Sequence, residues 1–260
     1  MQAITNNQGN YDMRLENKTT IVTGAASGLG KAIVEKFLEE GSKVIIVDIN
    51  EDAALELSED LGPKTLAVKA DVGDTSSVEN LKKCVFDSFE RVDIVVNNAG
   101  VTHLPTPLDE VTEEDFDRVF RINCKSVYLM AKAFVPEMKK HQKGSILNIA
   151  STAGVSPRPN LNWYNSSKGW MNTATKTMAV ELAPFGVRVN AVNPVASETP
   201  LLASFMGEDT PEIRQKFLST IPLGRFAQPQ DIANAACYLS SDEASMVTGV
   251  CMQVDGGRCI

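Results

Sequence analysis

The chain has 260 residues, with 25 Lys and Arg against 33 Asp and Glu, and a formal net charge of −8. This charge disfavours nonspecific binding to nucleic acid or to an anionic membrane, and no apolar run is long enough to span a bilayer. The five cysteines are scattered without a Cys-x-x-Cys pair and there are two histidines, so no metal site is predicted. The polar start does not resemble a signal peptide. We therefore expect a cytoplasmic protein with reduced thiols.

Short apolar runs alternate with amphipathic stretches. Residues 1–14 are expected to form a flexible tail, followed by a single domain over 15–260. Strands are expected near 21–22, 43–48, 65–68, 92–97, 145–150, 187–193 and 250–254. Helices are expected near 32–38, 51–61, 74–90, 113–140 (in two pieces), 162–184 and 229–240. This alternation predicts an α/β fold, a Rossmann-type doubly wound parallel sheet of about seven strands with helices on both faces.

The first expected strand runs into a turn formed by Gly24, Gly28 and Gly30, with the spacing Gly-x-x-x-Gly-x-Gly. Glycines let the backbone approach a pyrophosphate, and the following helix offers free N–H groups and a positive dipole. The alternative is a turn that merely connects strand and helix, but the context favours dinucleotide binding. Asp48 ends the second expected strand, where a carboxylate accepts hydrogen bonds from the ribose of NAD and repels the 2′-phosphate of NADP. Its alternative is to cap the next helix; we favour NAD.

Tyr164 and Lys168 are four residues apart in an expected helix, so they share one face. A lysine cation beside a phenol lowers the pKa of the tyrosine, and such a tyrosine can exchange a proton with an alcohol or a carbonyl. The alternative is a solvated helix face. Ser151 follows the fifth expected strand, at an edge where pockets of parallel sheets form. Thr152 is the other candidate for the side chain that contacts the substrate, and the alternative is that Ser151 is an ordinary turn serine.

These segments resemble the short-chain dehydrogenase/reductase family, from about residue 15 to the C-terminus. The matching segments are 23–30, Asp71-Val72, 97–100, Asn123, Ser151, Tyr164, Lys168, Asn193-Pro194 and 255–257. The pattern is most similar to 3-oxoacyl reductases and to alcohol or sugar dehydrogenases. The resemblance implies a homotetramer and hydride transfer between a carbinol carbon and a nicotinamide.

The resemblance also implies a catalytic tetrad of Asn123, Ser151, Tyr164 and Lys168. Ser151 would bond the substrate oxygen, Tyr164 would transfer the proton, and Lys168 would lower the pKa of Tyr164 and hold the nicotinamide ribose. Asn123 would hold a water that relays protons to Lys168; its alternative is a helix-interior asparagine bonded to a neighbouring carbonyl. Asp71 is expected at the adenine and Asn97 under the adenosine. The implied cofactor-binding set, which shares Tyr164 and Lys168, also has Gly24, Ser27, Gly28, Leu29, Gly30, Asp48, Asp71, Val72, Asn97, Ala99, Gly100, Pro194 and Thr199.

The chain departs from the family after the sixth expected strand. Val195 replaces the usual glycine and Ser197 a usual β-branched apolar residue, while Thr199 is kept as a possible partner of the nicotinamide amide. An irregular, partly helical insertion at about 198–220 is expected to cover the substrate. Arg158 would meet an anionic substrate or be solvated. The candidate substrate residues are His103, Leu104, Leu161, Trp163, Leu202 and Met206.

The leading prediction is an NAD-dependent enzyme that interconverts a secondary alcohol and a ketone of small or medium size. A 3-oxoacyl thioester reductase is the alternative. Its acidic carrier-protein partner would need a basic patch near the cleft, for which the candidates are Lys139, Lys140, Lys143 and Arg158. A nucleotide-sensing or scaffold protein is the alternative of another class. A broken tetrad would mark it, and all four residues are present.

Overall fold

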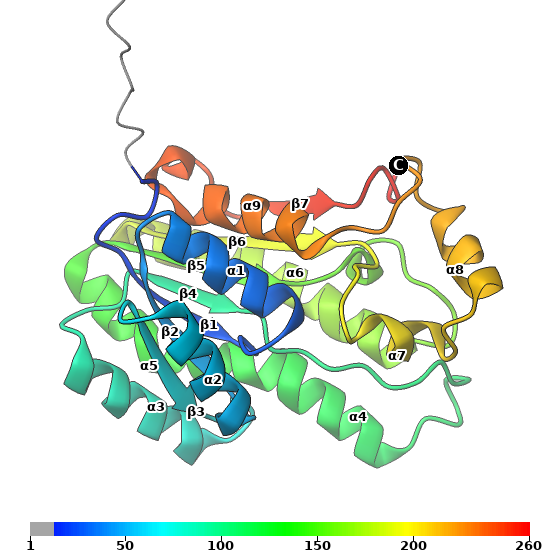
Figure 1. Cartoon of the computed structure of the whole chain (residues 1–260), viewed down its shortest axis with the longest axis horizontal. Coiled ribbons are helices and arrows are strands. Elements are labelled where there is room, and N and C mark those ends of the chain that lie inside the picture. The colour runs from blue at the N-terminus through cyan, green and yellow to red at the C-terminus, as the bar shows by residue number, and fades with distance from the viewer. Residues whose placement is uncertain (1–12) are drawn as a thin grey trace, which may run out of the picture.

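The computed structural model describes residues 13–260 (Figure 1). One sheet contains β1 (Thr19–Thr23), β2 (Lys43–Asp48), β3 (Thr65–Lys69), β4 (Ile94–Asn97), β5 (Gly144–Ile149), β6 (Val187–Pro194) and β7 (Cys251–Val254). The strand order is β3-β2-β1-β4-β5-β6-β7, and all neighbouring strands are parallel. The predicted doubly wound parallel sheet is therefore confirmed. Most of the expected tail, residues 1–12, lies outside the described residues, and Arg14 at its end bonds to Glu243.

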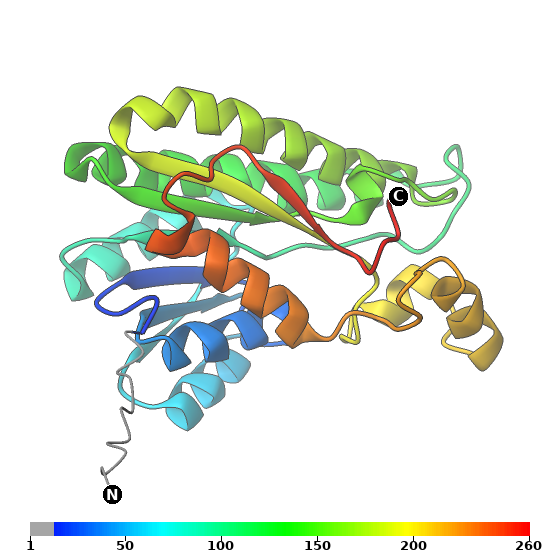
Figure 2. The ribbon, with the colours of Figure 1, turned by 90° about the horizontal axis from the view of Figure 1, so that it is seen from above.

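Helices cover both faces of the sheet, as Figure 2 shows from above. One face packs against α1 (Gly28–Glu39), α2 (Glu51–Leu61) and α9 (Pro229–Ser240). The other face packs against α3 (Thr75–Ser88), α5 (Ser126–His141) and α6 (Asn162–Leu182). The central strands are buried on both sides, which accounts for their nearly continuous apolar sequences. No helix between residues 13 and 260 is both long and apolar enough to cross a membrane.

The long helix expected over 113–140 is one run rather than two separate pieces. It consists of α4 (Glu113–Phe120), a π-helical turn η1 (Arg121–Lys125) and α5 without a break. The insertion after β6 is partly helical, as predicted, with α7 (Leu202–Met206) and α8 (Pro211–Leu218). Both lie beyond the carboxyl ends of the strands (Figure 1).

The sheet has its topological switch between β1 and β4, because the chain runs outward to β3 and then returns to the other side of β1. In open parallel sheets, ligands bind beyond the carboxyl ends of the strands at this point. The turns after β1, β4, β5 and β6 all open onto that edge. The fold therefore brings the glycine turn and the predicted catalytic residues to the same side of the molecule.

Candidate active site

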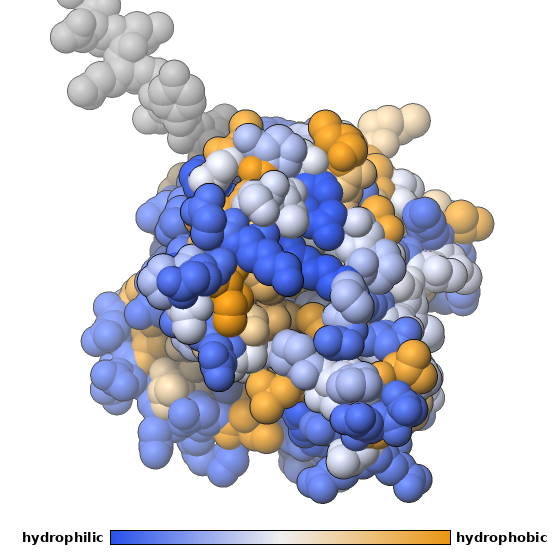
Figure 3. Space-filling model, turned by 90° about the vertical axis from the view of Figure 1, so that its right-hand side faces the viewer, coloured by the Kyte–Doolittle hydropathy of each residue, from blue (hydrophilic) through white to orange (hydrophobic). Residues whose placement is uncertain are grey.

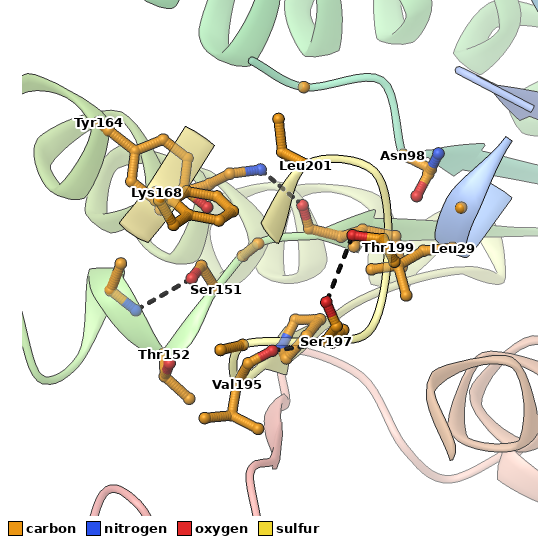
Figure 4. A pocket seen from close by; sticks show the side chains of 18 of the residues that line it. Leu29, Asn98, Ser151, Thr152, Tyr164, Lys168, Val195, Ser197, Thr199 and Leu201 are labelled. Atoms are coloured by element: carbon orange, nitrogen blue, oxygen red, sulfur yellow. Dashed lines mark hydrogen bonds between the residues drawn. The ribbon is translucent and has the colours of Figure 1, made fainter. Parts of the chain in front are cut away.

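A cavity of about 400 Å³ opens at the carboxyl edge of the sheet. Figure 3 shows a hollow on this side, with apolar side chains inside it and polar side chains around it. The turn after β1 and the end of β2 line one half, which we call the nucleotide half. The segments after β5 and β6, with α6, α7 and α8, line the other, which we call the carbonyl half. In Figure 4, Asn98 lies toward the first and Tyr164 toward the second.

Close backbone contacts shape the glycine turn. Gly24 has a φ of +60°, and a Cβ there would lie 2.8 Å from the Cα of Ala99. A Cβ at Gly30 would lie 2.1 Å from the Gly24 carbonyl oxygen and 2.6 Å from Asn98 Nδ2, so no larger residue fits. The Ser27 side chain makes no capping hydrogen bond, which leaves the N-terminus of α1 without a side-chain acceptor. The turn therefore fits a pyrophosphate. Cavity-lining residues here are Gly24, Ser27, Gly28, Leu29, Ala99 and Gly100.

Asp48, the last residue of β2, also lines the cavity. Its Oδ2 accepts a hydrogen bond from the N–H of Ala26 and its Oδ1 from the N–H of Asn50, each at 3.0 Å. Asn50 is the residue that caps α2, by accepting from the N–H of Ala53 at 3.2 Å. The capping alternative for Asp48 is therefore wrong. A carboxylate offers about four acceptor positions, so Asp48 can still bind the hydroxyls of a ribose.

Asn97, expected under the adenosine, is turned away from the cavity. It is 4% exposed, and its Nδ2 donates to Asn148 Oδ1 at 2.8 Å. The next residue, Asn98, lines the cavity, and its Nδ2 donates to the carbonyl oxygens of Thr23 and Gly24, both at 2.9 Å. Successive side chains point to opposite faces at the end of a strand. Asn98, rather than Asn97, is therefore the asparagine of this segment at the site.

Asp71 and Val72 follow β3 and do not line the cavity. Asp71 Oδ2 accepts from Arg121 Nη1 at 2.7 Å, and its Oδ1 accepts from the N–H of Gly73 at 2.9 Å. Val72 is buried in the core under α3 and α5. The contact between Asp71 and adenine stays a prediction, and in this structure Arg121 and Gly73 hold the Asp71 carboxylate.

Tyr164 and Lys168 project from the first two turns of α6 into the carbonyl half (Figure 4). They are 6% and 4% exposed, so the solvated-face alternative is wrong. Lys168 Nζ donates to the carbonyl oxygen of Ile149 at 2.8 Å and lies 6.0 Å from the centre of the Tyr164 ring. The hydroxyl of Ser151, rather than that of its rival Thr152, lies beside the Tyr164 phenol. These three side chains converge at the end of β5.

The pKa values at this site are dominated by burial. Burial raises the pKa of Tyr164 to about 12, and the neighbouring Ser151 hydroxyl opposes that shift. Burial also lowers the pKa of Lys168 to about 8. The pKa of Tyr164 thus lies above its ordinary value, because burial disfavours the phenolate. The expectation that Lys168 lowers this pKa stays a prediction.

Asn123 lies in the π-helical turn η1 and is fully buried. Its Oδ1 accepts from the N–H of Val101, and its Nδ2 donates to the carbonyl oxygen of Val101 and to Ser167 Oγ, all at 2.9 Å. Ser167 Oγ in turn donates to the carbonyl oxygen of Tyr164 at 2.7 Å. Asn123 thus links the segment after Gly100 to α6, and the carbonyl that it bonds belongs to Val101 rather than to its own helix. Such π-helical turns often occur at functional sites.

The segment after β6 accepts Val195 in place of the usual glycine because its backbone has no positive φ there. Val195 is buried, and its N–H donates to the carbonyl oxygen of Val254 at 3.2 Å. Thr199 Oγ1 donates to the carbonyl oxygen of Ser197 at 3.4 Å. Pro194, Val195, Ser197 and Thr199 all line the cavity. The substitution therefore leaves the segment against the cavity.

The insertion faces the cavity with residues one position away from those predicted. Leu202 and Met206 are 3% and 7% exposed and pack into the core. Leu201 and Phe205 line the cavity instead, and the Phe205 ring centre is 5.0 Å from that of Tyr164. One residue corresponds to about 100° of rotation around a helix. The rotation of α7 about its axis therefore points Leu201 and Phe205 at the cavity and Leu202 and Met206 at the core.

Three further substrate candidates lie outside the cavity. Trp163 packs edge-on against Phe116 of α4, with 5.3 Å between the ring centres. Leu104 is exposed, and His103 is buried with its Nδ1 2.7 Å from the carbonyl oxygen of Leu104. Leu161 does line the cavity, as predicted. Between residues 13 and 260, no group of three or more His, Cys, Asp or Glu side chains is placed to hold a metal ion.

Asn98, Phe205 and Phe217, the last from α8, line the cavity although none of them was chosen as a candidate site residue. Asn98 stood in the matching segment, but the resemblance pointed to its neighbour Asn97, the last residue of β4, whose side chain faces away from the cavity. Phe205 and Phe217 gave no signal beyond ordinary amphipathic spacing, so their side of each helix could be seen only in the fold.

Comparison with known proteins agrees with this geometry. A family model described as Enoyl-(Acyl carrier protein) reductase matches residues 24–258. The chain is 46% identical to 4-formylbenzenesulfonate dehydrogenase of Comamonas testosteroni and 41% identical to 3-oxoacyl-[acyl-carrier-protein] reductase of Thermotoga maritima. Each alignment covers 95% of this chain and 100% of the relative.

A solved structure has the same fold. It is a 3-ketoacyl-(acyl-carrier-protein) reductase from Brucella melitensis in complex with NADH, with a TM-score of 0.90 and 44% identity over 95% of this chain and 100% of that one. These relatives are named as dehydrogenases and reductases, which makes this protein an enzyme that acts on CH–OH groups. The chain belongs to the short-chain dehydrogenase/reductase family.

Proposed function

We propose that this protein is an NAD(H)-dependent oxidoreductase that interconverts a secondary alcohol and a ketone, with Tyr164 as general acid and base. The observation that carries the proposal is that one cavity is lined by the glycine turn, by Asp48 and by Ser151 together with the buried Tyr164 and Lys168. A nicotinamide dinucleotide supplies or accepts the hydride when bound there. The chain's own residues bind it, orient it and move the proton.

Asp48 supports NAD over NADP. Its carboxylate lines the nucleotide half of the cavity, where a 2′-phosphate would meet a negative charge. Among the described residues that line the cavity, the basic side chains are Arg158 and Lys168, and both belong to the carbonyl half. A 2′-phosphate therefore has no cavity-lining cation within the described residues of the nucleotide half.

Tyr164 is the group placed to exchange a proton with the substrate oxygen. In reduction it donates its phenolic proton, and in oxidation it accepts one from the carbinol. The Ser151 hydroxyl, beside the Tyr164 phenol, would hold the substrate oxygen in hydrogen-bonding distance. Lys168, whose pKa is lowered to about 8, can hold or lose a proton near neutral pH. We propose that Asn123 positions a water that passes protons to Lys168.

A 3-oxoacyl thioester reductase is the second candidate, favoured by the names of relatives with 41% and 44% identity. Most of the basic residues that were expected to bind an acyl carrier protein do not lie near the cavity. Lys139, Lys140 and Lys143 lie at the C-terminus of α5 and before β5, which is the opposite edge of the sheet from the cavity. Only Arg158 of that group lines the cavity.

We also propose that the protein is a homotetramer, and a cytoplasmic location stays a prediction of the sequence. The C-terminal strand β7 is an edge strand, paired only with β6 in the sheet. Near it, Met246 is 97% exposed and Val250 is 39% exposed. Light scattering of the purified protein would give the mass, and a monomer mass would contradict the assembly.

A turnover screen tests the proposed function. Nicotinamide absorbance is followed with NAD and with NADP across secondary alcohols, diols, sugars and 3-hydroxyacyl thioesters, with benzylic alcohols added because one relative is named for a formylbenzenesulfonate. We expect turnover of secondary alcohols with NAD. Turnover of acyl thioesters alone, with NADPH preferred over NADH for the reduction of the 3-oxoacyl thioester, would contradict the proposal and favour the second candidate.

A further inference from the structure

Two arginines without a carboxylate partner lie together in the carbonyl half. Arg158 lines the cavity from the loop between β5 and α6. Its guanidinium carbon stacks 4.0 Å from the centre of the Phe217 ring, and its Nη2 donates to Thr220 Oγ1 at 3.2 Å. Arg258 donates from Nη1 to Ser156 Oγ at 2.9 Å, and Ser156 also lines the cavity. Neither arginine is among the ion pairs formed by residues 13–260.

The two charges affect one another. Burial lowers the pKa of Arg158 to about 10, and the charge of Arg258 adds to the shift. The Nε of Arg258 is buried without a hydrogen-bond partner. Burying a cation without a counterion is unfavourable. Arg158 and the Ser156 that Arg258 contacts both line the cavity, so these two partly buried guanidinium groups form a positive site that an anion would relieve, although the whole chain has a net charge of −8.

Among residues 13–260, no carboxylate lines the cavity beside this site. The carboxylate that lines the cavity is Asp48, and it lies at the end of β2 in the nucleotide half. Arg158 instead follows β5, and β1 and β4 lie between β2 and β5 in the sheet. Guanidinium groups bind carboxylate and sulfonate oxygens through paired N–H donors, and stacking on an aromatic ring fixes the orientation of those donors.

The wall between Arg158 and Tyr164 is apolar. Phe205 approaches Tyr164 with 5.0 Å between ring centres, and Phe217 lies under Arg158. Leu161 and Leu201 complete this part of the lining. Resting on the proposed function, we propose that Arg158, with Arg258 behind it, binds a carboxylate or sulfonate on the substrate, while the apolar wall holds an aromatic-sized body between that anion and the reacting carbon.

Binding rather than turnover provides the direct test. Wild-type protein saturated with NAD is titrated by calorimetry with 4-acetylbenzoate and with its neutral counterpart 4-acetylbenzamide. Ketone and NAD are both oxidised, so the mixture cannot react. Because hydrogen bonds to charged groups contribute about 1.5–3 kcal/mol, we expect the benzoate to bind roughly 10- to 100-fold more tightly. Equal binding, or no binding of either probe, would overturn the proposal.

Variants assign the preference to the two arginines. Arg158→Gln should remove the preference for the benzoate, Arg158→Lys should keep part of it, and Arg258→Gln should reduce it less than Arg158→Gln does. Arg225→Gln is the matched control, because Arg225 is 54% exposed and pairs with Asp231. An unchanged preference in Arg158→Gln would overturn the proposal. The sulfonate 4-acetylbenzenesulfonate serves as the second anionic probe and should follow the same order.

The same probes keep this inference separate from the proposed function. Preferential binding of the anion without turnover of the corresponding alcohol, 4-(1-hydroxyethyl)benzoate, would support the anion site and contradict the proposed reaction. Turnover of this alcohol and of its neutral amide with equal kcat/KM would support the reaction and overturn the anion site.

Discussion

The two halves of the cavity are built in different ways. In the nucleotide half, backbone shape defines the site: Gly24 and Gly30 are forced by contacts of 2.8 Å and 2.1 Å, and Asp48 is placed by the end of a strand. In the carbonyl half, side chains from α6, α7 and α8 form the wall. A site shaped by the backbone is suited to a ligand that stays the same, such as the cofactor. A site shaped by side chains can be adapted to a different substrate by replacing a few residues.

The same difference explains what could be predicted from the sequence. The parallel sheet of alternating strands and helices, the glycine turn, Asp48 and the helix bearing Tyr164 and Lys168 follow from local patterns of glycine and apolar residues. The choice between Leu202 and Leu201, or between Asn97 and Asn98, depends on the rotation of one helix or the end of one strand. Single-residue shifts of this kind are set by tertiary packing, which no local pattern contains.

The burial of Tyr164 was missed for another reason. The spacing of Tyr164 and Lys168 correctly placed both on one face, but spacing carries no information on burial. The structure buries both groups, so desolvation raises one pKa and lowers the other. The π-helical turn at Asn123 was missed as well, since one inserted residue shifts the apolar pattern only once and short apolar patterns are irregular in any case.

The largest expected effect is the loss of kcat when the proton donor of the carbonyl half is removed. Tyr164→Phe removes the proton donor and should lower kcat by about 10²–10⁴-fold, the usual contribution of general acid–base catalysis. NADH binding, measured by fluorescence titration, should be nearly unchanged. Tyr128→Phe, on an exposed part of α5, is the control. A wild-type kcat in Tyr164→Phe would remove this residue from the mechanism.

A pair of variants on α7 sharpens the comparison within that half. Leu202→Ala empties part of the core and should lower the free energy of unfolding by about 2–5 kcal/mol, with little change in KM. Phe205→Ala opens the cavity wall and should raise KM for the substrate with a smaller loss of stability. Urea unfolding and steady-state kinetics measure the two effects. A larger loss of stability in Phe205→Ala and a larger rise in KM in Leu202→Ala would show that α7 is rotated differently.

The nucleotide half is tested by Asp48→Ala. Loss of hydrogen bonds to a charged acceptor should weaken NAD by about 10- to 100-fold in kcat/KM and should raise the relative rate with NADP. Asp52→Ala, at an exposed position in the first turn of α2, is the neighbouring control. Unaltered cofactor selectivity in Asp48→Ala would exclude this carboxylate from the ribose site.

The smallest expected effect is on stability against pH. The pKa of Lys168 is lowered to about 8 in the folded protein, below its value of about 10.4 in an unfolded chain. Between these values the unfolded chain binds more protons, so this group makes the free energy of unfolding rise with pH. Tyr164, with its pKa raised to about 12, has the opposite effect, but only above about pH 10.

Lys168→Met isolates this contribution. The free energy of unfolding of this variant should exceed that of the wild type by the largest amount near about pH 7. The excess should shrink by about pH 9.5, because the buried lysine of the wild type has then lost its proton. Urea unfolding at both pH values gives the difference, and Lys176→Met, on the exposed side of α6, is the matched control. A difference between wild type and Lys168→Met that does not change with pH would contradict a buried, titrating lysine.

A crystal structure of the protein with bound NADH tests the division of the cavity most directly. The account predicts the adenosine ribose against Asp48, the pyrophosphate on the turn of Gly24 and Gly28, and the nicotinamide facing Ser151 and Tyr164. A dinucleotide bound outside this cavity, or one whose nicotinamide lies away from Tyr164, would contradict it.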